Sequence, residues 1–355
     1  MDSLRLRVRN IWSCYMTDEI KRATISIVGV ALTMLVPLCA TAAPPRSPTN
    51  LCIDGANCVE DPPPVSTSCE MPADTWTTHS TALGTIKKSL DWETGDFTQC
   101  GTFVYRDGSG GSPPTDQVAV EKTLTRQGKY AARFMVKEGD QDSRRETIHL
   151  ECHASERNVP GEEDYYAYSF YLPKDFAPDA DYVIVNQFHS GWHGGANPQF
   201  GFLLNTGPQS KGPLGTGYFS SKGGLLNWNG TTFSYADSKD QSTTVVVGGW
   251  NDLIMHFIWS TDSKKGRVEI WQRGGSETRF RKTVDWNKAT LYYGQGKTES
   301  ISASEAYAGA KFGVYAGTQA NGEPLTKNVT VIHDGFRRGS TLLSVASGFG
   351  CSPPK

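Results

Sequence analysis

Apolar and polar residues alternate with a period of two along much of this chain, a pattern that predicts β-strands. In the segment 183–189 the alternation places Val183, Val185, Gln187 and His189 on one face. Two apolar residues followed by two polar ones indicate a strand that runs from a core into a cleft. Similar segments, separated by Gly, Asn, Asp and Pro, predict strands at 101–105, 131–136, 165–172, 200–204, 243–247, 253–260, 267–272, 311–315 and 330–336.

About ten strands with few helical segments predict an all-β chain, folded as a two-sheet antiparallel β-sandwich of the jelly-roll, concanavalin-like kind. Residues 166–172 alternate so that one side is an aromatic wall. Residues 253–260 are apolar on both faces, and a strand buried on both faces is central in its sheet. His256 lies within that strand and is expected to be a satisfied core residue.

The N-terminal segment has the order of a secretory signal. Two basic residues precede an apolar run over 23–38, which is followed by small residues. We predict a signal peptide over 1–42, with Met16 as an alternative start, a Pro-rich linker over 43–68 and the β-sandwich over 69–355. The protein is therefore expected to be secreted, to the extracellular space or the periplasm.

Two of the eight cysteines fall in the predicted signal, and the other six are Cys52, Cys58, Cys69, Cys100, Cys152 and Cys351. An even number in an exported chain without a Cys-x-x-Cys pair predicts up to three disulfides and no metal site. One set of pairs joins Cys52 to Cys58, Cys69 to Cys351 and Cys100 to Cys152, although fifteen connectivities are formally open.

Charge limits the classes of partner. The chain has 35 basic and 37 acidic residues and a formal net charge of −2, which gives no basic field for nucleic acid. We expect no nucleic-acid partner, no membrane after removal of the signal, and a monomer. An anionic ligand would have to be bound by a local cluster of residues.

The first candidate cluster is Arg144, Arg145 and Glu146, just before the strand expected near Ile148. An Arg held by Glu146 would present its planar fork to a substrate carboxylate. A surface ion pair is the alternative interpretation.

The second candidate is Gln187 with His189, which is followed at once by a Gly-rich loop carrying Trp192 and His193. The indole offers a flat surface for stacking on a sugar ring, and the glycines let the backbone approach a ligand. A solvent-facing polar pair is the alternative. Two further aromatic residues that would extend such a groove are Tyr218 and Trp228.

The third candidate is the strand face formed by Lys311, Gly313 and Tyr315, although an ordinary edge strand would show the same pattern. His149 and His153 share a face as well, but we find no acidic partner that would complete a zinc site there. The chain has no Gly-x-Ser-x-Gly elbow and no phosphate-binding loop. A retaining glycosidase needs two carboxylates, and the strand 267–272 supplies one.

The three candidates occur in an order that resembles the signature strands of jelly-roll polysaccharide lyases: Arg144-x-Glu146, Gln187-x-His189 and Lys311-Phe312-Gly313-Val314-Tyr315. The resemblance covers about residues 80 to 340, and the Trp250-Asn251-Asp252 strand is similar to the heparinase-type and glucuronan-lyase-type branch. Thr147 and Ala316-Gly317 depart from the pattern of the alginate-lyase branch, so alginate is not the first choice of substrate.

The resemblance implies β-elimination next to a uronate. Gln187 and one Arg of the 144/145 pair would neutralise the C6 carboxylate as preorganised donors. Tyr315 would act as both base and acid, with Lys311 favouring its phenolate. His189 would be the base in an anti elimination, or otherwise would polarise Tyr315. No cofactor is required, and a structural Ca²⁺, found in some relatives, stays open although no ligand set is apparent.

We therefore predict a secreted lyase that acts on an anionic polysaccharide, with glucuronan as the first choice and alginate or a glycosaminoglycan next. Substrate contacts are expected from Arg145, Glu146, Trp192, His193, Tyr218 and Trp228. A jelly-roll glycoside hydrolase is the alternative enzyme. A non-catalytic, lectin-like carbohydrate-binding domain would share the fold and the aromatic residues while needing no acid or base.

Overall fold

The structure is a computed structural model that describes residues 68–106, 115–140, 147–154, 157–190, 196–206, 213–319 and 321–353, with the backbone alone at 105, 106 and 147–149. The predicted signal peptide and all but the last residue of the predicted linker lie outside these residues, as do Cys52 and Cys58. Within the described ranges, no helix is both long enough and apolar enough to cross a membrane.

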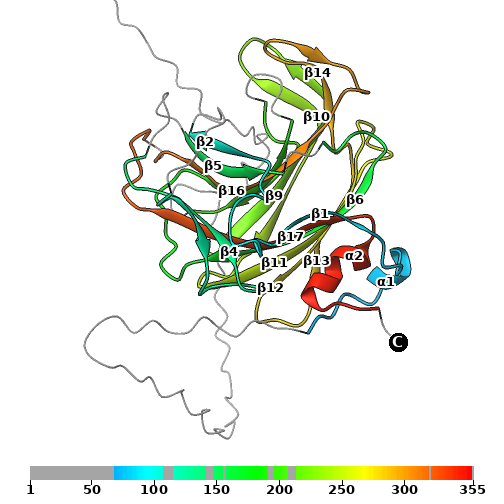
Figure 1. Ribbon diagram of the computed structural model, residues 1–355. Coiled ribbons are helices and arrows are strands. Elements are labelled where there is room, and N and C mark those ends of the chain that lie inside the picture. The colour runs from blue at the N-terminus through cyan, green and yellow to red at the C-terminus, as the bar shows by residue number, and fades with distance from the viewer. Residues whose placement is uncertain are drawn as a thin grey trace, which may run out of the picture. The chain divides into compact units, whose positions relative to one another are not determined.

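Two β-sheets dominate the described residues (Figure 1). The eight-stranded sheet has the order β13 (Arg281–Asn287), β12 (Arg267–Gly274), β11 (Gly249–Ile258), β6 (Glu163–Leu172), β17 (Val329–Gly339), β4 (Ala131–Val136) and β3 (Val118–Glu121), with β1 (Ile86–Leu90) also paired to β17. The nine-stranded sheet has the order β15 (Ser300–Ile301), β14 (Tyr292–Gln295), β9 (Thr216–Trp228), β8 (Phe200–Leu204), β7 (Val183–His189), β16 (Gly309–Gly317), β5 (Thr147–His153) and β2 (Thr102–Arg106), with β10 (Phe233–Thr244) paired to β9. Apart from the parallel contact of β14 with β9, the strand pairs are antiparallel, so the predicted β-sandwich is confirmed.

The core between the sheets is largely aromatic. The predicted wall on β6 is confirmed, because Tyr166, Tyr168, Phe170 and Leu172 all belong to the main hydrophobic cluster. Rings also meet across the two sheets: Phe170 lies 5.5 Å from Phe202 of β8 between ring centroids. Each fully buried ring of this kind stabilises the fold by about 2–3 kcal/mol.

Strand β11 is central, as predicted, with β6 on one side and β12 on the other. Its residues Leu253, Met255 and Phe257 face the core. Ile254 and His256 face the outer side, where a second hydrophobic cluster covers the sheet.

The two short helices in the described residues, α1 (Thr75–Thr78) and α2 (Leu342–Ala346), lie close together beside the eight-stranded sheet (Figure 1). Trp76 of α1 packs in one cluster with Leu342 and Val345 of α2. A capping box starts α2, in which the Thr341 hydroxyl accepts from the backbone N–H of Ser344. A 3₁₀ turn, η1 (Ser347–Phe349), follows it.

The sequence did not predict the long hairpin of β9 and β10, which have 13 and 12 residues. Its second strand is polar and mostly exposed, so the pattern of apolar positions that marks the other strands is missing. The strand expected at 243–247 is accordingly wrong, because β10 ends at Thr244 and residues 245–247 belong to no strand. Three predicted strands, 131–136, 183–189 and 200–204, match β4, β7 and β8 residue for residue.

Two disulfides confirm the cysteine prediction where the structure tests it. Cys69 is bonded to Cys351 across 282 residues, with a Cα–Cα distance of 4.6 Å. Cys100 is bonded to Cys152, with a Cα–Cα distance of 5.7 Å. The first bond lies in the cluster over the outer face of the eight-stranded sheet. The second anchors β5, because Cys152 is buried in the main core.

The Cys69–Cys351 bond should contribute strongly to stability because it closes a very long loop in the unfolded chain. We expect replacement of both cysteines by serine to lower the free energy of unfolding by about 2–5 kcal/mol. Urea denaturation of the protein measures this change. Free thiols at both positions in peptide maps of the unmodified protein would contradict the assignment.

Candidate functional site

Lys311 and Tyr315 lie on the outer face of the nine-stranded sheet, as their spacing on β16 predicts. The residues between them show why: Phe312 and Val314 are buried in the main core. Both Lys311 and Tyr315 are partly exposed. A cation and a phenol therefore project from the same side of β16.

Strand register extends this face over neighbouring strands. Lys311 pairs with Gln187 of β7 on one side and with His153 of β5 on the other. Gln187 pairs with Gly201 of β8, which pairs with Ser220 of β9. The resulting row of residues runs across five strands and has its charged group near one end.

A β-bulge that the sequence did not reveal interrupts β7. Val183, Val185 and Phe188 all face the core, because the register between β7 and β8 shifts near Val185. The bulge reverses the alternation and turns Gln187 to the outer face, with His189 following it two residues later. The prediction that one face carries Val183, Val185, Gln187 and His189 together is therefore wrong.

Gly313 is required where it stands. Its φ of 148° is in a region that other residues rarely adopt, and a Cβ there would collide with the carbonyl oxygen of Leu150. The Gly313 carbonyl accepts a hydrogen bond at 2.9 Å from Nε2 of His333, which reaches it from the other sheet. Burial lowers the pKa of His333 to about 4, so the ring is neutral and donates this bond from a single tautomer.

Glu151 is a buried carboxylate that the sequence analysis overlooked. It pairs with Gly313 on β16, and both of its oxygens lie within 2.6 and 2.8 Å of Nε2 of Gln187. Because a carboxylate only accepts, it fixes the amide with its donor end toward Glu151. The signal was present in the sequence, since Glu151 lies between His149 and His153 on the same strand face.

His153 is kept neutral by its surroundings. Burial lowers its pKa, the Lys311 cation lowers it further, and Glu151 opposes both effects. The row therefore combines one fixed cation with a neutral imidazole. At neutral pH such an imidazole can donate or accept a hydrogen bond without adding charge.

Tyr315 has a second tyrosine against it. The Tyr182 hydroxyl donates to the Tyr315 oxygen at 3.2 Å, and the two rings meet edge-on with centroids 5.5 Å apart. Gly317 makes room for this arrangement, because a Cβ there would lie 2.8 Å from the Tyr182 ring. The Gly317 N–H also donates to the Tyr182 carbonyl. Sequence reasoning missed Tyr182 because it precedes β7 and belongs to no periodic pattern.

His189 lies apart from Tyr315. Tyr315 pairs with Ile184, five residues before His189, which corresponds to about 16 Å along β7. The His189 ring instead donates from Nε2 to the carbonyl of Ala196 at 2.9 Å. The structure does not bring His189 and Tyr315 side by side.

Tyr218 and Trp228, the two aromatic residues predicted to extend the groove, lie at different positions along β9. Tyr218 is in the same row as Tyr315, through Leu203 and Ile184. Trp228 is ten residues further along, about 33 Å on an extended strand, at the end of the hairpin. There it packs on Phe233, and Lys297 lies 4.7 Å above its ring.

Several predicted site residues lie outside the described part of the chain: Arg144, Arg145, Glu146, Trp192 and His193. Strand β5 begins at Thr147, directly after the first three of these. The other two follow β7 in the sequence. Their roles stay predictions.

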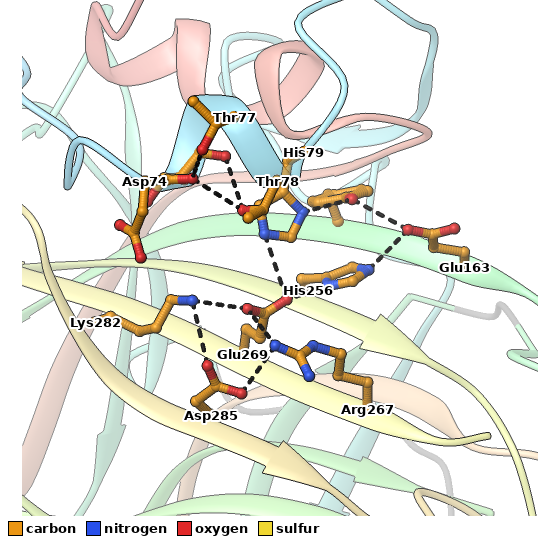
Figure 2. Close-up of polar contacts among 12 residues, drawn as sticks. Asp74, Thr77, Thr78, His79, Glu163, His256, Arg267, Glu269, Lys282 and Asp285 are labelled. Atoms are coloured by element: carbon orange, nitrogen blue, oxygen red, sulfur yellow. Dashed lines mark hydrogen bonds and ion pairs between the residues drawn. The ribbon is translucent and has the colours of Figure 1, made fainter. Parts of the chain in front are cut away.

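The carboxylate that the strand 267–272 would supply for glycoside hydrolysis, Glu269, belongs to the other sheet (Figure 2). Burial would raise its pKa, but contacts with His256, His79, Arg267 and Lys282 hold that pKa well below the usual range. Glu269 is therefore a fixed anion and cannot serve as a general acid. His256 is buried as expected, although its partners are carboxylates and not only apolar groups.

Comparison with known proteins gives a consistent result. A family model described as polysaccharide lyase matches residues 92–337. The endo-β-1,4-glucuronan lyase of the fungus Trichoderma reesei has a similar fold, with a TM-score of 0.54 at 17% identity over 74% of this chain and 98% of that one. An exolytic alginate lyase of Zobellia galactanivorans (TM-score 0.45, 12% identity, 71% and 98% covered) and a β-glucanase domain of Podospora anserina (0.44, 12%, 73% and 100%) are less similar. No curated protein sequence matches the chain significantly.

Removing the Lys311 charge should raise the pKa of His153 toward its ordinary value, because one of the two lowering causes disappears while burial remains. Lys311→Met keeps a similar stem, and an NMR titration of the His153 ring, identified with His153→Gln, measures the shift. Lys264→Met, in an exposed turn, serves as the control and should leave this pKa unchanged. An unchanged or lower pKa in Lys311→Met would show that the two groups do not interact.

Proposed function

Because the chain belongs to the polysaccharide lyase family, we propose that it is a secreted enzyme that cleaves a uronic-acid polysaccharide by β-elimination. Glucuronan is the first-choice polymer, supported by the fold shared with a glucuronan lyase and by the residues after Tyr315, which depart from the alginate-lyase pattern. Alginate or a glycosaminoglycan comes next. The observation that supports this chemistry best is Tyr315 on an open strand face, with Tyr182 donating to its oxygen.

Elimination begins with the C6 carboxylate, because the proton on C5 becomes acidic only when the carboxylate charge is neutralised. Lys311 supplies a cation on the same face as Tyr315, and neutral His153 beside it can add a hydrogen bond. Arg144 or Arg145 is proposed as the second donor. Gln187 contributes less directly than the sequence indicated, because Glu151 takes the donor end of its amide.

Tyr315 is proposed as both base and acid. Its phenolate removes the proton from C5, the C5–H electron pair forms the C4=C5 double bond, and the C4–O4 bond breaks. The Tyr315 hydroxyl then returns the proton to O4, so the phenolate is regenerated. One group suffices for both steps in D-glucuronate or D-mannuronate, where H5 and O4 lie on the same ring face.

Tyr182 favours this role. A hydroxyl that donates to the Tyr315 oxygen stabilises the phenolate more than the neutral phenol, since hydrogen bonds to charged groups are the stronger ones. Its ring also packs edge-on against Tyr315 and limits the movement of the catalytic side chain. His189, predicted from sequence as the alternative base or as the group that polarises Tyr315, lies five residues along β7 from Ile184, the partner of Tyr315, so we propose it as a substrate contact instead.

Secretion is proposed from the signal-like N-terminus, and the two disulfides support it, because such bonds persist in oxidising compartments. The alternative enzyme, a glycoside hydrolase, would need two carboxylates across the scissile bond. Glu151 does not suit that role because it is buried and accepts hydrogen bonds from Gln187. Glu269 does not suit it because it lies on the other sheet.

A panel of polymers decides among the three classes of protein. A lyase produces the ultraviolet absorbance of an unsaturated uronate, a hydrolase produces only reducing ends, and a lectin-like domain produces neither. We expect absorbance to rise first with glucuronan. Release of reducing ends without absorbance would favour the hydrolase.

Tyr315→Phe should abolish the lyase activity while leaving the fold and polymer binding intact, because it removes the hydroxyl that takes up and returns the proton and keeps the ring with its packing. General acid and general base catalysis each contribute about 10²- to 10⁴-fold, so the loss of kcat should reach at least that range. Tyr171→Phe, on the outer side of the eight-stranded sheet, is the matched control. If Tyr315→Phe retains most of its rate and His189→Ala does not, the roles of the two residues are reversed.

Tyr182→Phe should slow the reaction less severely, by about tenfold or somewhat more near neutral pH, since one hydrogen bond to a charged group contributes about 1.5 kcal/mol or more. Because the phenolate of Tyr315 loses its donor, the acid side of the pH–rate profile should move to higher pH, and activity should recover in alkaline buffer. A uniform loss at every pH would assign Tyr182 a packing role only.

A further inference from the structure

His79, His256 and Glu269 form a compact cluster on the outer face of the eight-stranded sheet, where Figure 2 shows them converging from three segments. His79 directly follows α1, His256 is on β11 and Glu269 is on β12. Their ligand-type atoms all lie within 4.8 Å of one another, and the three side chains are 6% exposed or less. The cluster is on the sheet that does not carry Lys311 and Tyr315.

The two oxygens of Glu269 have different surroundings. Oε1 accepts from Arg267 Nη2 at 2.9 Å and from Lys282 Nζ at 2.8 Å. Oε2 faces the two imidazoles, at 2.8 Å from Nδ1 of His256 and 3.4 Å from Nε2 of His79. One oxygen is thus satisfied by cations, and the other is directed at two nitrogens.

Outer partners orient both rings. The Tyr165 hydroxyl donates to Glu163 at 3.1 Å, so its oxygen accepts from Nδ1 of His79, also at 3.1 Å. Glu163 in turn accepts from Nε2 of His256 at 2.8 Å. A histidine whose one nitrogen is bound in this way to a carboxylate or hydroxyl is the usual arrangement behind metal-ligating imidazoles.

This orientation leaves Nε2 of His79 as the lone-pair nitrogen, buried and without a hydrogen-bond partner. A lone pair that faces a carboxylate oxygen repels it unless a positive charge, either a proton or a metal ion, lies between the two atoms. The separation of 3.4 Å is long for an N–H···O hydrogen bond. It matches the edge of about 3.3 Å expected between two ligands of a tetrahedral ion that binds each at about 2.0 Å.

Charge and donor type agree with a cation at this place. Three carboxylates, Glu163, Glu269 and Asp285, face two fixed cations, Arg267 and Lys282, so the cluster has a surplus of negative charge. Two imidazoles and one carboxylate suit zinc and its neighbours among the transition metals, whereas Ca²⁺ prefers six or more oxygens.

We propose that His79, His256 and Glu269 bind one divalent transition-metal ion, with Zn²⁺ as the first candidate and water in the fourth position. Nδ1 of His256 and Oε2 of Glu269 move apart by about half an ångström to accept it. The ion joins the segment after α1 to strands β11 and β12, so its role is structural. It does not take part in the elimination, and the proposal is independent of the lyase assignment.

The test uses the full secreted chain, stripped of metal and titrated with ZnCl₂ alone by isothermal calorimetry and thermal denaturation. We expect one ion per chain, a higher melting temperature, and no such effect of CaCl₂. His79→Gln should abolish saturable binding. Tyr165→Phe, which removes the hydroxyl that accepts from Nδ1 of His79 and donates to Glu163, should weaken binding by about 10- to 100-fold. Co²⁺ in place of Zn²⁺ should give the visible absorption of a four-coordinate site.

Histidines of the other sheet provide the control, because His153→Gln and His189→Gln should leave zinc stoichiometry and affinity unchanged. Zinc binding that survives His79→Gln but disappears in either of these variants would overturn the proposal. The absence of saturable binding to the unmodified chain would also overturn it, and the cluster would then be held together by a proton on His256.

Discussion

The aromatic core between the two sheets is the constraint on which the rest of the structure depends, because the strands that line it must each turn one face of apolar side chains inward. Polar residues that can bind a ligand or react therefore lie on the opposite, outer faces of these strands. On β16, burial of Phe312 and Val314 is what turns Lys311 and Tyr315 outward. On β11, burial of Met255 and Phe257 turns His256 to the other surface of the molecule. The two polar clusters are therefore separated by the thickness of the sandwich.

Local alternation predicts much of this from sequence, since the side-chain period of a strand is a local property. It predicted β4, β7 and β8 and the outward direction of Lys311 and Tyr315. It failed at the bulges, because an extra residue in one strand depends on the register of its neighbours. The requirement for glycine at position 313 arises in the same way from the backbone of another strand, at Leu150.

The residues that sequence reasoning missed owe their positions to contacts between distant segments. Tyr182 and Tyr315 are 133 residues apart in sequence, and His79, near the N-terminal end of the described residues, meets Glu269 of the distant strand β12. Glu151 differs, because its place between His149 and His153 was visible in the sequence. The role of Glu151 was not visible, because it depends on the hydrogen bond from the Gln187 side chain, which reaches Glu151 across Gly313.

The bond between Cys69 and Cys351 turns the described domain into a covalent ring, since its two ends meet with their Cα atoms 4.6 Å apart. In a closed ring of this kind, the chain ends need not lie at these two positions. A short peptide linking these two positions would therefore let the chain start and end elsewhere, for example at the exposed turn 229–232 between β9 and β10. That turn is far along the hairpin from the Tyr315 row, so the order of the sequence could be permuted while the architecture is retained.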